Sequence, residues 1–303
     1  MRRLLKHLLA LFVACFAASL WAGSIDVWIT QESPLQQAFV DALTPALADA
    51  GHEIGTIVNS AAVVSPAPSS ARVVVALGMN ATLSALRQSD ATVLATLLSK
   101  RDAERVLSEY GTQRLAAIVL DQPVERRLRL LEQLVPDVES VVVLLGNRTA
   151  SHRGKIEDAI RAAGLAPRIA VINEPAEIVA KLEALLDPQA ALLTVPDPEV
   201  YNRDTVMGIL LTTYRHRRPV IGFTAAYVRA GAVAAVYSDP QDIAMQVVQL
   251  LTTAGSLADF PRGILAPSRF RVAINERVSR SLGLPVISEL ETLERLRAAE
   301  AAK

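Results

Sequence analysis

The chain has 303 residues, of which 51% are hydrophobic and 20% are charged, and its 31 basic residues equal its 31 acidic ones in number. This apolar composition excludes a disordered chain, and the length provides for two lobes with cores of ordinary size. The lack of a basic excess argues against a nucleic-acid partner, because nucleic-acid-binding proteins gather positive charge against the phosphate backbone.

Residues 1–22 have the pattern of a secretory signal peptide. A basic start is followed by an apolar run that is shorter than the about 20 residues a membrane-spanning helix needs. We therefore predict a cleaved signal and a periplasmic protein, with an uncleaved anchor as the alternative. Cys15, the only cysteine, offers lipid attachment as a further alternative, although Phe12 departs from the lipidation pattern. The mature chain has no cysteine for a disulfide or a reactive thiol.

From residue 24 onward, short branched apolar runs alternate with segments of helical periodicity. This alternation predicts a doubly wound α/β unit in the first part of the chain. The predicted strands of this unit cover residues 24–31, 52–59, 71–78, 91–99 and 115–120. The predicted helices cover residues 34–50, 81–88 and 102–110.

The same alternation continues through a second α/β unit, so two similar lobes lie in tandem. Its predicted strands cover residues 140–146, 168–173, 191–197 and 219–224. Its predicted helices cover residues 124–137, 154–163, 176–186 and 204–216. The remaining residues include helices from Pro240 and Glu289, and they are too few for a third domain. We expect them to complete the two sheets.

The chain lacks the short motifs of several enzyme classes. It has no GxGxxG after the first strand, no GxxxxGK[ST] loop, no HExxH and no GxSxG. Only His52, His152 and His216 remain after the signal, and none has a second metal ligand at helical spacing. We therefore predict no catalytic residues, no metal site and no cofactor, and we do not expect an enzyme.

Polar side chains follow the predicted strands, where ligands bind in open α/β sheets. Capping of the next helix is an alternative role for these residues, for Ser33, Asn80 and Asp121 above all. The candidate ligand-binding residues are Glu32, Ser33, Asn80, Asp121, Asn147, Asp197, Tyr201, Thr224 and Tyr227.

Five aromatic residues are concentrated between positions 201 and 237. Tyrosine combines an apolar face with a polar tip, which suits a cleft that holds a small organic molecule. Tyr201 lies just beyond a predicted strand and is the better ligand candidate. We predict that Tyr214 and Phe223 fill the core, and that Tyr237 is structural.

Three segments resemble the ABC-transporter substrate-binding proteins of the tryptophan/tyrosine-type group. They are DQPVERRLRLLEQLVPDVESVVVLLGNRTA at 121–150, the run from VPDPEVYNRD to AAVYSDP at 195–240, and FRVAINERVSRSLGL at 270–284. The resemblance covers residues 116–284 well and the first lobe by pattern.

The resemblance implies a type I periplasmic-binding-protein fold, in which two doubly wound α/β lobes are joined by hinge crossovers. It implies a first lobe of residues 23–120 plus about 226–258, a second lobe of residues 121–225 plus about 259–287, and a tail helix of residues 288–303. It further implies that Glu32, Ser33, Asn80, Asp121, Asn147, Asp197 and Thr224 face an interlobe cleft.

The function implied is that of an exported, monomeric protein that captures a small organic molecule, such as an amino acid, and delivers it to an ABC permease. A sensory or partner-docking module of the cell envelope without a transport role is the alternative. The chain departs from the family in two places. Thr224 and Ala225 stand where many members carry an acidic pair suited to a ligand amine, and residues 99–121 contain a charged helix in place of a small-residue loop.

Overall fold

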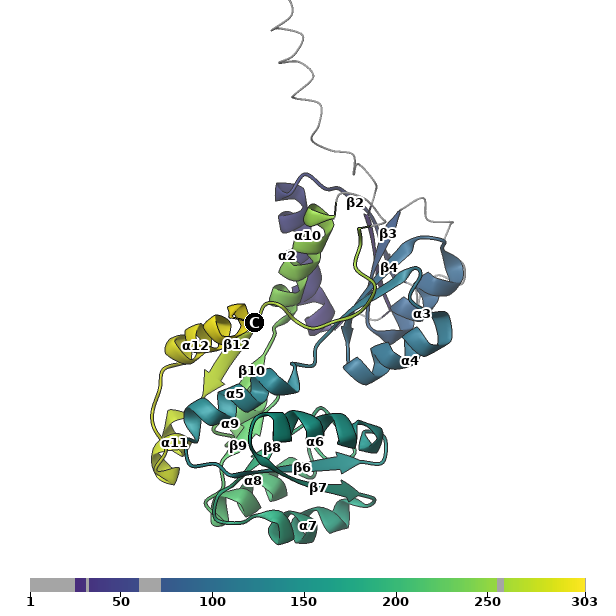
Figure 1. Cartoon of the computed structure of the whole chain (residues 1–303). Helices are drawn as coiled ribbons and strands as arrows, with labels where there is room; N and C mark the ends of the chain where they lie inside the picture. The colour runs from purple at the N-terminus through teal and green to yellow at the C-terminus, as the bar shows by residue number, and fades with distance from the viewer. Residues whose placement is uncertain (1–24, 31–32, 60–71, 255–258, 303) are drawn as a thin grey trace, which may run out of the picture. The chain divides into compact units, whose positions relative to one another are not determined.

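The computed structural model describes residues 25–30, 33–59, 72–254 and 259–302 (Figure 1). The predicted signal peptide, with Cys15, and the candidate residue Glu32 lie outside these ranges. Within them, none of the helices has the length and the apolar character needed to cross a membrane.

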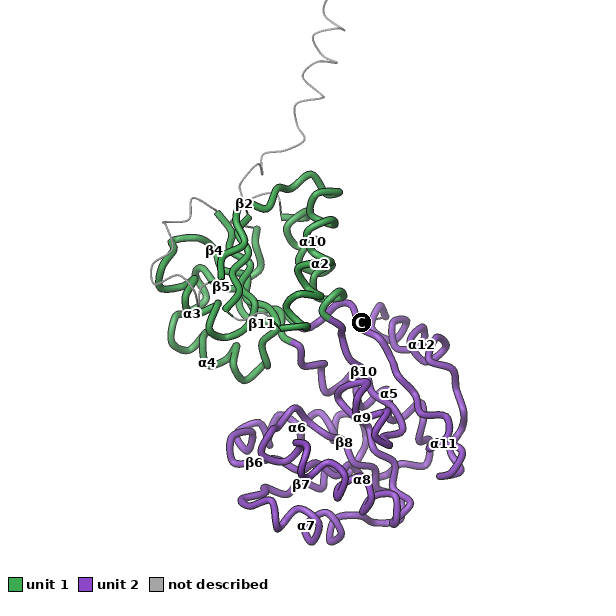
Figure 2. Tube along the Cα trace, turned by 180° about the vertical axis from the view of Figure 1, so that it is seen from behind, with its two compact units in different colours: residues 1–119, 240–265 green, residues 120–239, 266–303 purple. Residues whose placement is uncertain are grey.

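The chain divides into two units, each built from two separate stretches of sequence (Figure 2). Unit 1 consists of Met1–Val119 and Pro240–Leu265, and unit 2 consists of Leu120–Asp239 and Ala266–Lys303. The chain therefore passes between the units three times.

The sheet of unit 1 has the order β11-β5-β4-β3-β1-β2, and all its neighbouring strands within the described residues are parallel. Its strands are β1 (Ile25–Ile29), β2 (Ile54–Asn59), β3 (Val73–Leu77), β4 (Thr92–Leu98), β5 (Leu115–Val119) and β11 (Gly263–Leu265). Its helices are α2 (Pro34–Asp49), α3 (Met79–Gln88), α4 (Lys100–Tyr110) and α10 (Pro240–Thr253), and α2 packs beside α10 (Figure 1). Both β3 and β5 are fully buried, as branched apolar runs covered on both faces should be.

The sheet of unit 2 has the order β12-β10-β9-β8-β6-β7 and is parallel except for β12, which runs antiparallel to β10. Its strands are β6 (Ser140–Gly146), β7 (Ala166–Ile172), β8 (Ala190–Leu193), β9 (Val220–Gly222), β10 (Ala234–Tyr237) and β12 (Arg271–Ile274). Its α-helices are α5 (Val124–Leu134), α6 (Arg153–Ala162), α7 (Ile178–Leu185), α8 (Val206–Arg215), α9 (Ala225–Ala230), α11 (Glu276–Leu282) and α12 (Glu289–Ala301).

The two sheets have the same strand order, and they differ in direction at the edge strands β11 and β12. In each, the first strand of the unit lies between the second and the third, and later strands extend the sheet on one side. The prediction of two doubly wound α/β lobes is confirmed. The order reverses at β1 in unit 1 and at β6 in unit 2, so the carboxyl ends of these strands and their neighbours are where such folds bind ligands.

The division of the chain differs from the predicted one at residues 226–239. These residues were assigned to the first lobe, but α9 and β10 belong to unit 2. The reason is strand pairing, since β10 lies between β9 and β12 and pairs with both. The second passage between the units is therefore at Asp239, and the third is at Leu265 rather than near residue 258.

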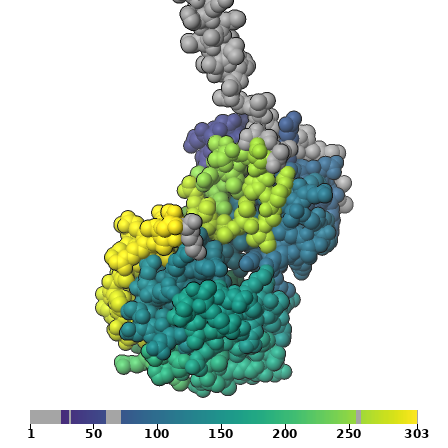
Figure 3. Space-filling model, viewed as in Figure 1, coloured from purple at the N-terminus to yellow at the C-terminus, as the bar shows by residue number. Residues whose placement is uncertain are grey.

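The predicted tail helix is an integral part of unit 2. Helix α12 packs against α5 and β12, and its surface, yellow in Figure 3, covers one side of the unit. Leu296 and Thr292 on this helix are fully buried. Although most residues of α12 are charged or exposed, Leu296 packs into the hydrophobic core of unit 2.

Candidate functional site

The loops after β6, β8 and β9 lie at the carboxyl edge of the unit 2 sheet, because these three strands are parallel neighbours. The loops and the start of α9 carry five of the nine predicted site residues, which are Asn147, Asp197, Tyr201, Thr224 and Tyr227. The structure therefore brings these five residues to one edge of one sheet. We describe this edge as the candidate site.

Asp197 connects two of these loops through hydrogen bonds. Its Oδ2 accepts hydrogen bonds from the Gly146 amide at 2.6 Å and from the Thr149 hydroxyl, and its Oδ1 accepts one from the Glu199 amide at 2.9 Å. The side chain is 1% exposed. Because both carboxylate oxygens are engaged by the loops, Asp197 positions the edge, and the structure gives it no free oxygen for a ligand.

Gly146 is the residue that allows this close approach. A Cβ atom at this position would lie 2.5 Å from Glu199 Oε2 and 2.9 Å from Asp197 Oδ2. Glu199 in turn accepts from the Arg148 amide at 3.2 Å and pairs with the Arg148 guanidinium at 3.2 Å. Asn147, a predicted site residue, lies exposed in the same loop.

Tyr201, Phe223 and Tyr227 form an aromatic triad at the edge. The Tyr201 ring contacts the other two edge-on, at centroid distances of 6.2 and 6.3 Å, and the Phe223 and Tyr227 rings lie 4.7 Å apart. Tyr227 approaches the backbone of Gly222 so closely that a Cβ there would lie 2.6 Å from the Tyr227 Cβ. Phe223, predicted to fill the core, is thus a partly buried member of the triad. Tyr214, also predicted to fill the core, is 52% exposed, so that prediction is wrong.

The three rings differ in accessibility. Tyr201 is buried, so the predicted ligand contact of Tyr201 has little room. Phe223 and Tyr227 are half-buried. Burial raises the pKa of Tyr201 and raises the pKa of Tyr227 to about 12, so both phenols are neutral at physiological pH.

Thr224 begins helix α9. Its hydroxyl oxygen accepts a hydrogen bond from the Tyr227 amide at 3.4 Å, which makes it the N-cap of the helix. The cap holds Tyr227 one turn after Phe223 and so sets the geometry of the triad.

Arg127, on α5, lies beneath this edge and was not among the predicted site residues. It is 3% exposed, and its Nη2 donates to the carbonyl oxygens of Thr194 and, at 3.4 Å, of Gly222. Its Nε is buried without an acceptor. Burial lowers the pKa of Arg127 to about 10, although Tyr201 and Asp121 act in the opposite direction. The sequence held a signal for this residue, because Arg127 shares a helical face with Leu130, Leu131 and Leu134.

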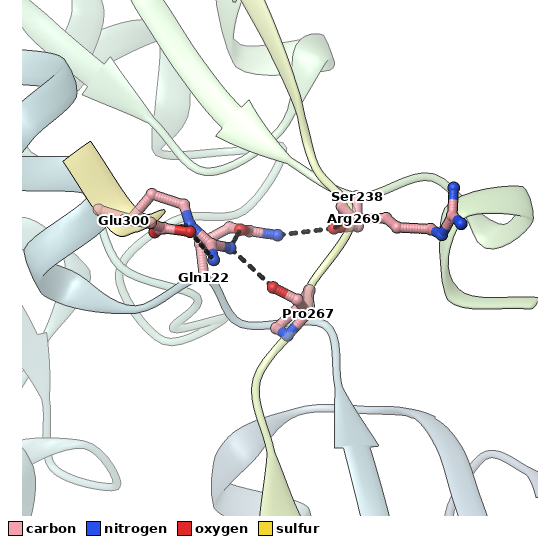
Figure 4. Close-up of polar contacts among 6 residues, drawn as sticks. Gln122, Ser238, Pro267, Arg269 and Glu300 are labelled. Atoms are coloured by element: carbon pink, nitrogen blue, oxygen red, sulfur yellow. Dashed lines mark hydrogen bonds and ion pairs between the residues drawn. The ribbon is translucent and has the colours of Figure 1, made fainter. Parts of the chain in front are cut away.

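A second polar cluster, centred on Arg126, lies where the connecting segments enter and leave unit 2 (Figure 4). Arg126 forms a bidentate ion pair with Glu300 at 2.5 and 2.8 Å, donates to Gln122 Oε1 at 2.6 Å and to the Pro267 carbonyl at 2.8 Å, and covers the Phe270 ring at 3.9 Å. Gln122 donates to the Ser238 hydroxyl at 2.8 Å. Gln122, Ser238 and Pro267 each lie within a few residues of one passage of the chain between the units, so the cluster joins all three segments on the unit 2 side.

The other predicted residues that the structure describes are not part of the triad. In unit 1, Ser33 caps α2 by accepting from the Gln36 amide at 3.2 Å, and Asn80 is exposed in the first turn of α3. Both follow neighbouring strands, β1 and β3, so they lie at the carboxyl edge of the unit 1 sheet. Asp121 is half-buried between β5 and α5 in unit 2. Among the residues described, no cluster of His, Cys, Asp and Glu could hold a metal ion.

No family model and no curated protein sequence matches the chain. Solved structures match it over most of its length. A ligand-free, open substrate-binding protein with adhesive properties from Clostridium difficile is 15% identical, with a TM-score of 0.65, over 89% of this chain and 97% of that one. An ABC domain in complex with L-Trp from Streptococcus pneumonia is 15% identical, with a TM-score of 0.57, over 90% and 97%. A conserved domain protein from Vibrio cholerae is 16% identical, with a TM-score of 0.58, over 90% and 98%. The chain has the type I periplasmic-binding-protein fold.

Proposed function

We propose that the protein is an exported solute-binding protein of the tryptophan/tyrosine-type group that it resembles, and that it captures a small organic molecule for an ABC permease. The observation that carries the proposal is the aromatic triad at the carboxyl edge of the unit 2 sheet, where α/β folds bind ligands. Phe223 and Tyr227 supply half-buried ring surface for an apolar or aromatic ligand. The fold supports the proposal, since its solved neighbours include a protein in complex with L-Trp.

The loops of the edge are built to hold such a surface in place. Asp197 ties the loop after β6 to the loop after β8, and Thr224 fixes the start of α9. Rings held by a rigid frame lose little entropy when a ligand stacks on them, which favours binding. Nothing in this arrangement supplies a nucleophile with its base, and we expect the protein to bind its ligand without turnover.

The proposal is tested by a thermal-shift screen of the mature protein against aromatic and aliphatic carboxylates, amino acids, nucleosides and sugars. We expect one chemical class to raise Tm in proportion to the logarithm of ligand concentration, because a ligand bound only by the folded state stabilises it. Phe223→Ala should abolish the shift. Tyr214→Ala, which removes a 52% exposed ring from α8, is the matched control and should retain it. No stabilisation by any class would contradict the proposal.

Export is tested separately. The proposed periplasmic location requires removal of the signal at residues 1–22, which the intact mass of the protein purified from the periplasm would reveal. Cys15→Ser should leave the mass and location unchanged, whereas a loss of membrane association in that variant would favour the lipid-anchored alternative.

Delivery to a permease predicts that uptake of the ligand by the source cell falls when the gene is deleted. Uptake should return with the wild-type gene and not with the Phe223→Ala gene. Normal uptake combined with the loss of a ligand-dependent response would instead support the sensory alternative.

A further inference from the structure

The carboxyl edge of unit 2 has an imbalance of charge. Its carboxylates are engaged within the protein, since Asp197 accepts from three donors of the loops and Glu199 pairs with Arg148. Its buried cation is not neutralised in the same way, because Arg127 forms no ion pair with any residue that the structure describes. The edge therefore offers a positive charge and no free carboxylate.

The hydrogen-bonding capacity of Arg127 is largely unused. A guanidinium has five N–H donors, and of these only Nη2 meets acceptors, both of them uncharged carbonyl oxygens. The buried Nε has none. The hydroxyl of Tyr201, which lies close enough to Arg127 to interact with it electrostatically, is also buried, with the Leu144 backbone beside it. Arg127 thus interacts electrostatically with the buried hydroxyl of a triad residue and has N–H donors to spare.

Asp121 acts on Arg127 electrostatically, but no carboxylate that the structure describes forms an ion pair with it, and burial of such a cation is costly for the folded protein. The cost is relieved when an anion binds nearby. The attraction on a nearby anion is strong because a buried charge such as that of Arg127 is weakly screened. The lowered pKa of Arg127 agrees with this description, because it reports that the charged form is disfavoured in the ligand-free protein.

We propose that the ligand bound at this edge carries an anionic group, such as a carboxylate, whose charge Arg127 neutralises while the apolar part of the ligand stacks on Phe223 and Tyr227. This inference rests on the proposed function and narrows it to organic acids. An amine is not required for recognition, because the described carboxylates of the edge are already engaged by the loops or by Arg148.

The alternative is that Arg127 has only a structural role. In that role its hydrogen bonds to Thr194 and Gly222 would connect α5 to the ends of β8 and β9. Arg127→Gln separates the two roles. Glutamine carries no charge and keeps an uncharged N–H donor, although its shorter side chain ends near the position of the arginine Nε. Arg127→Lys keeps the charge and loses the planar set of donors.

The test uses three matched indole probes with the mature full chain. L-Tryptophan carries a carboxylate and an amine, indole-3-propionate lacks the amine, and L-tryptophanamide lacks the carboxylate. Phenylacetate and 4-hydroxyphenylacetate, each with its amide, extend the series to smaller rings. Calorimetry gives Kd for wild type and for Arg127→Gln, and thermal unfolding of each variant without probe verifies that it folds.

We expect wild type to bind the acids at least about tenfold more tightly than their amides, and indole-3-propionate to bind no worse than L-tryptophan. Arg127→Gln should lose the preference for acids and bind the amides as wild type does. An Arg127→Gln protein that folds and still prefers acids would overturn the inference.

Two further outcomes keep this inference distinct from the proposed function. Binding of amides as tightly as acids by wild type would overturn the anionic ligand while leaving a solute-binding protein in place, and this result needs no variant. Binding of no probe of either kind would contradict the proposed function, and the inference with it. If Arg127→Gln does not fold, Arg127→Lys and the acid-to-amide ratio of wild type decide the question.

Discussion

At the scale of single residues, the candidate site depends on close approaches that only small residues permit. Gly146 leaves room for Glu199 and Asp197, and Gly222 leaves room for Tyr227. In both cases a side chain of the candidate site occupies the space that a Cβ atom on the glycine would need. The carboxyl edge therefore tolerates little change in the backbone that supports it.

We predict that Gly146→Ala destabilises the protein by about 1–3 kcal/mol, because its methyl group would overlap Glu199 and Asp197. Gly154→Ala is the matched control. Gly154 lies in helix α6 with open space at the position of its Cβ, so alanine there should stabilise the protein by up to about 1 kcal/mol. Urea unfolding of both variants measures the difference, and equal effects would contradict the packing described here.

We predict that Tyr227 makes the stability of the protein fall at alkaline pH. Its pKa rises to about 12 on folding because of burial, so the folded protein keeps the phenol proton at a pH where the unfolded chain has lost it. The stabilisation is complete below pH 10 and is lost as the pH rises toward 12. Tyr227→Phe should flatten the fall in unfolding free energy across this range, measured by urea unfolding. Tyr214→Phe, at an exposed position, is the control, and an identical slope in the two variants would refute the prediction.

Capping and ligand binding were difficult to separate from the sequence at this scale. Both roles require a small polar residue directly after a strand and before a helix. The structure shows that Ser33 caps α2 and Thr224 caps α9, whereas Asn80 lies one residue inside α3 and caps nothing. The burial of Arg127 was not predicted from the sequence. Arg127 lies on a leucine-rich face of α5, but the charged residues next to it in the sequence suggest an exposed position.

At the scale of elements, the Arg126 cluster joins α5, α12 and the three connecting segments of unit 2. The guanidinium is nearly enclosed, and the carboxylate of Glu300 is its charged partner. Gln122 extends the contacts of the cluster to Ser238. A cluster of this kind is sensitive to the loss of one partner, because the buried charge that is left then lacks compensation.

We predict that Glu300→Gln lowers the unfolding free energy by about 2 kcal/mol, since it removes one partner of a charge-assisted, bidentate contact. Glu294→Gln, at an exposed position of the same helix, should change it by less than about 0.5 kcal/mol. Thermal unfolding compares the two, and limited proteolysis should cut α12 sooner in Glu300→Gln. An equal Tm for the two variants would refute the role given to the cluster.

The elements themselves were largely predictable, because each strand is a short branched apolar run and each helix has a periodic apolar face. Strand β10 was assigned to the wrong unit for a physical reason. A short strand that is buried on both faces has the same sequence pattern in either sheet, and only its pairing with β9 and β12 decides its place. Helix α12 was taken for an appendage because its two buried residues are few among many charges.

At the scale of the whole molecule, the two units repeat one strand order, and the chain enters and leaves unit 2 through segments joined by one polar cluster. The resemblance implies hinge crossovers between two lobes and an interlobe cleft, and from these we predict that the lobes close on a ligand. We expect a ligand found in the thermal-shift screen to lower the radius of gyration in solution X-ray scattering, because a ligand that contacts the closed form better shifts the population toward it. An unchanged radius at saturating ligand would exclude closure.

The central claim is that the carboxyl edge of unit 2 binds a small organic molecule through Phe223 and Tyr227. A crystal structure with a compound that stabilises the protein tests it most directly. We predict that the compound lies within about 4 Å of both rings. A well-ordered ligand that touches neither ring would contradict the account.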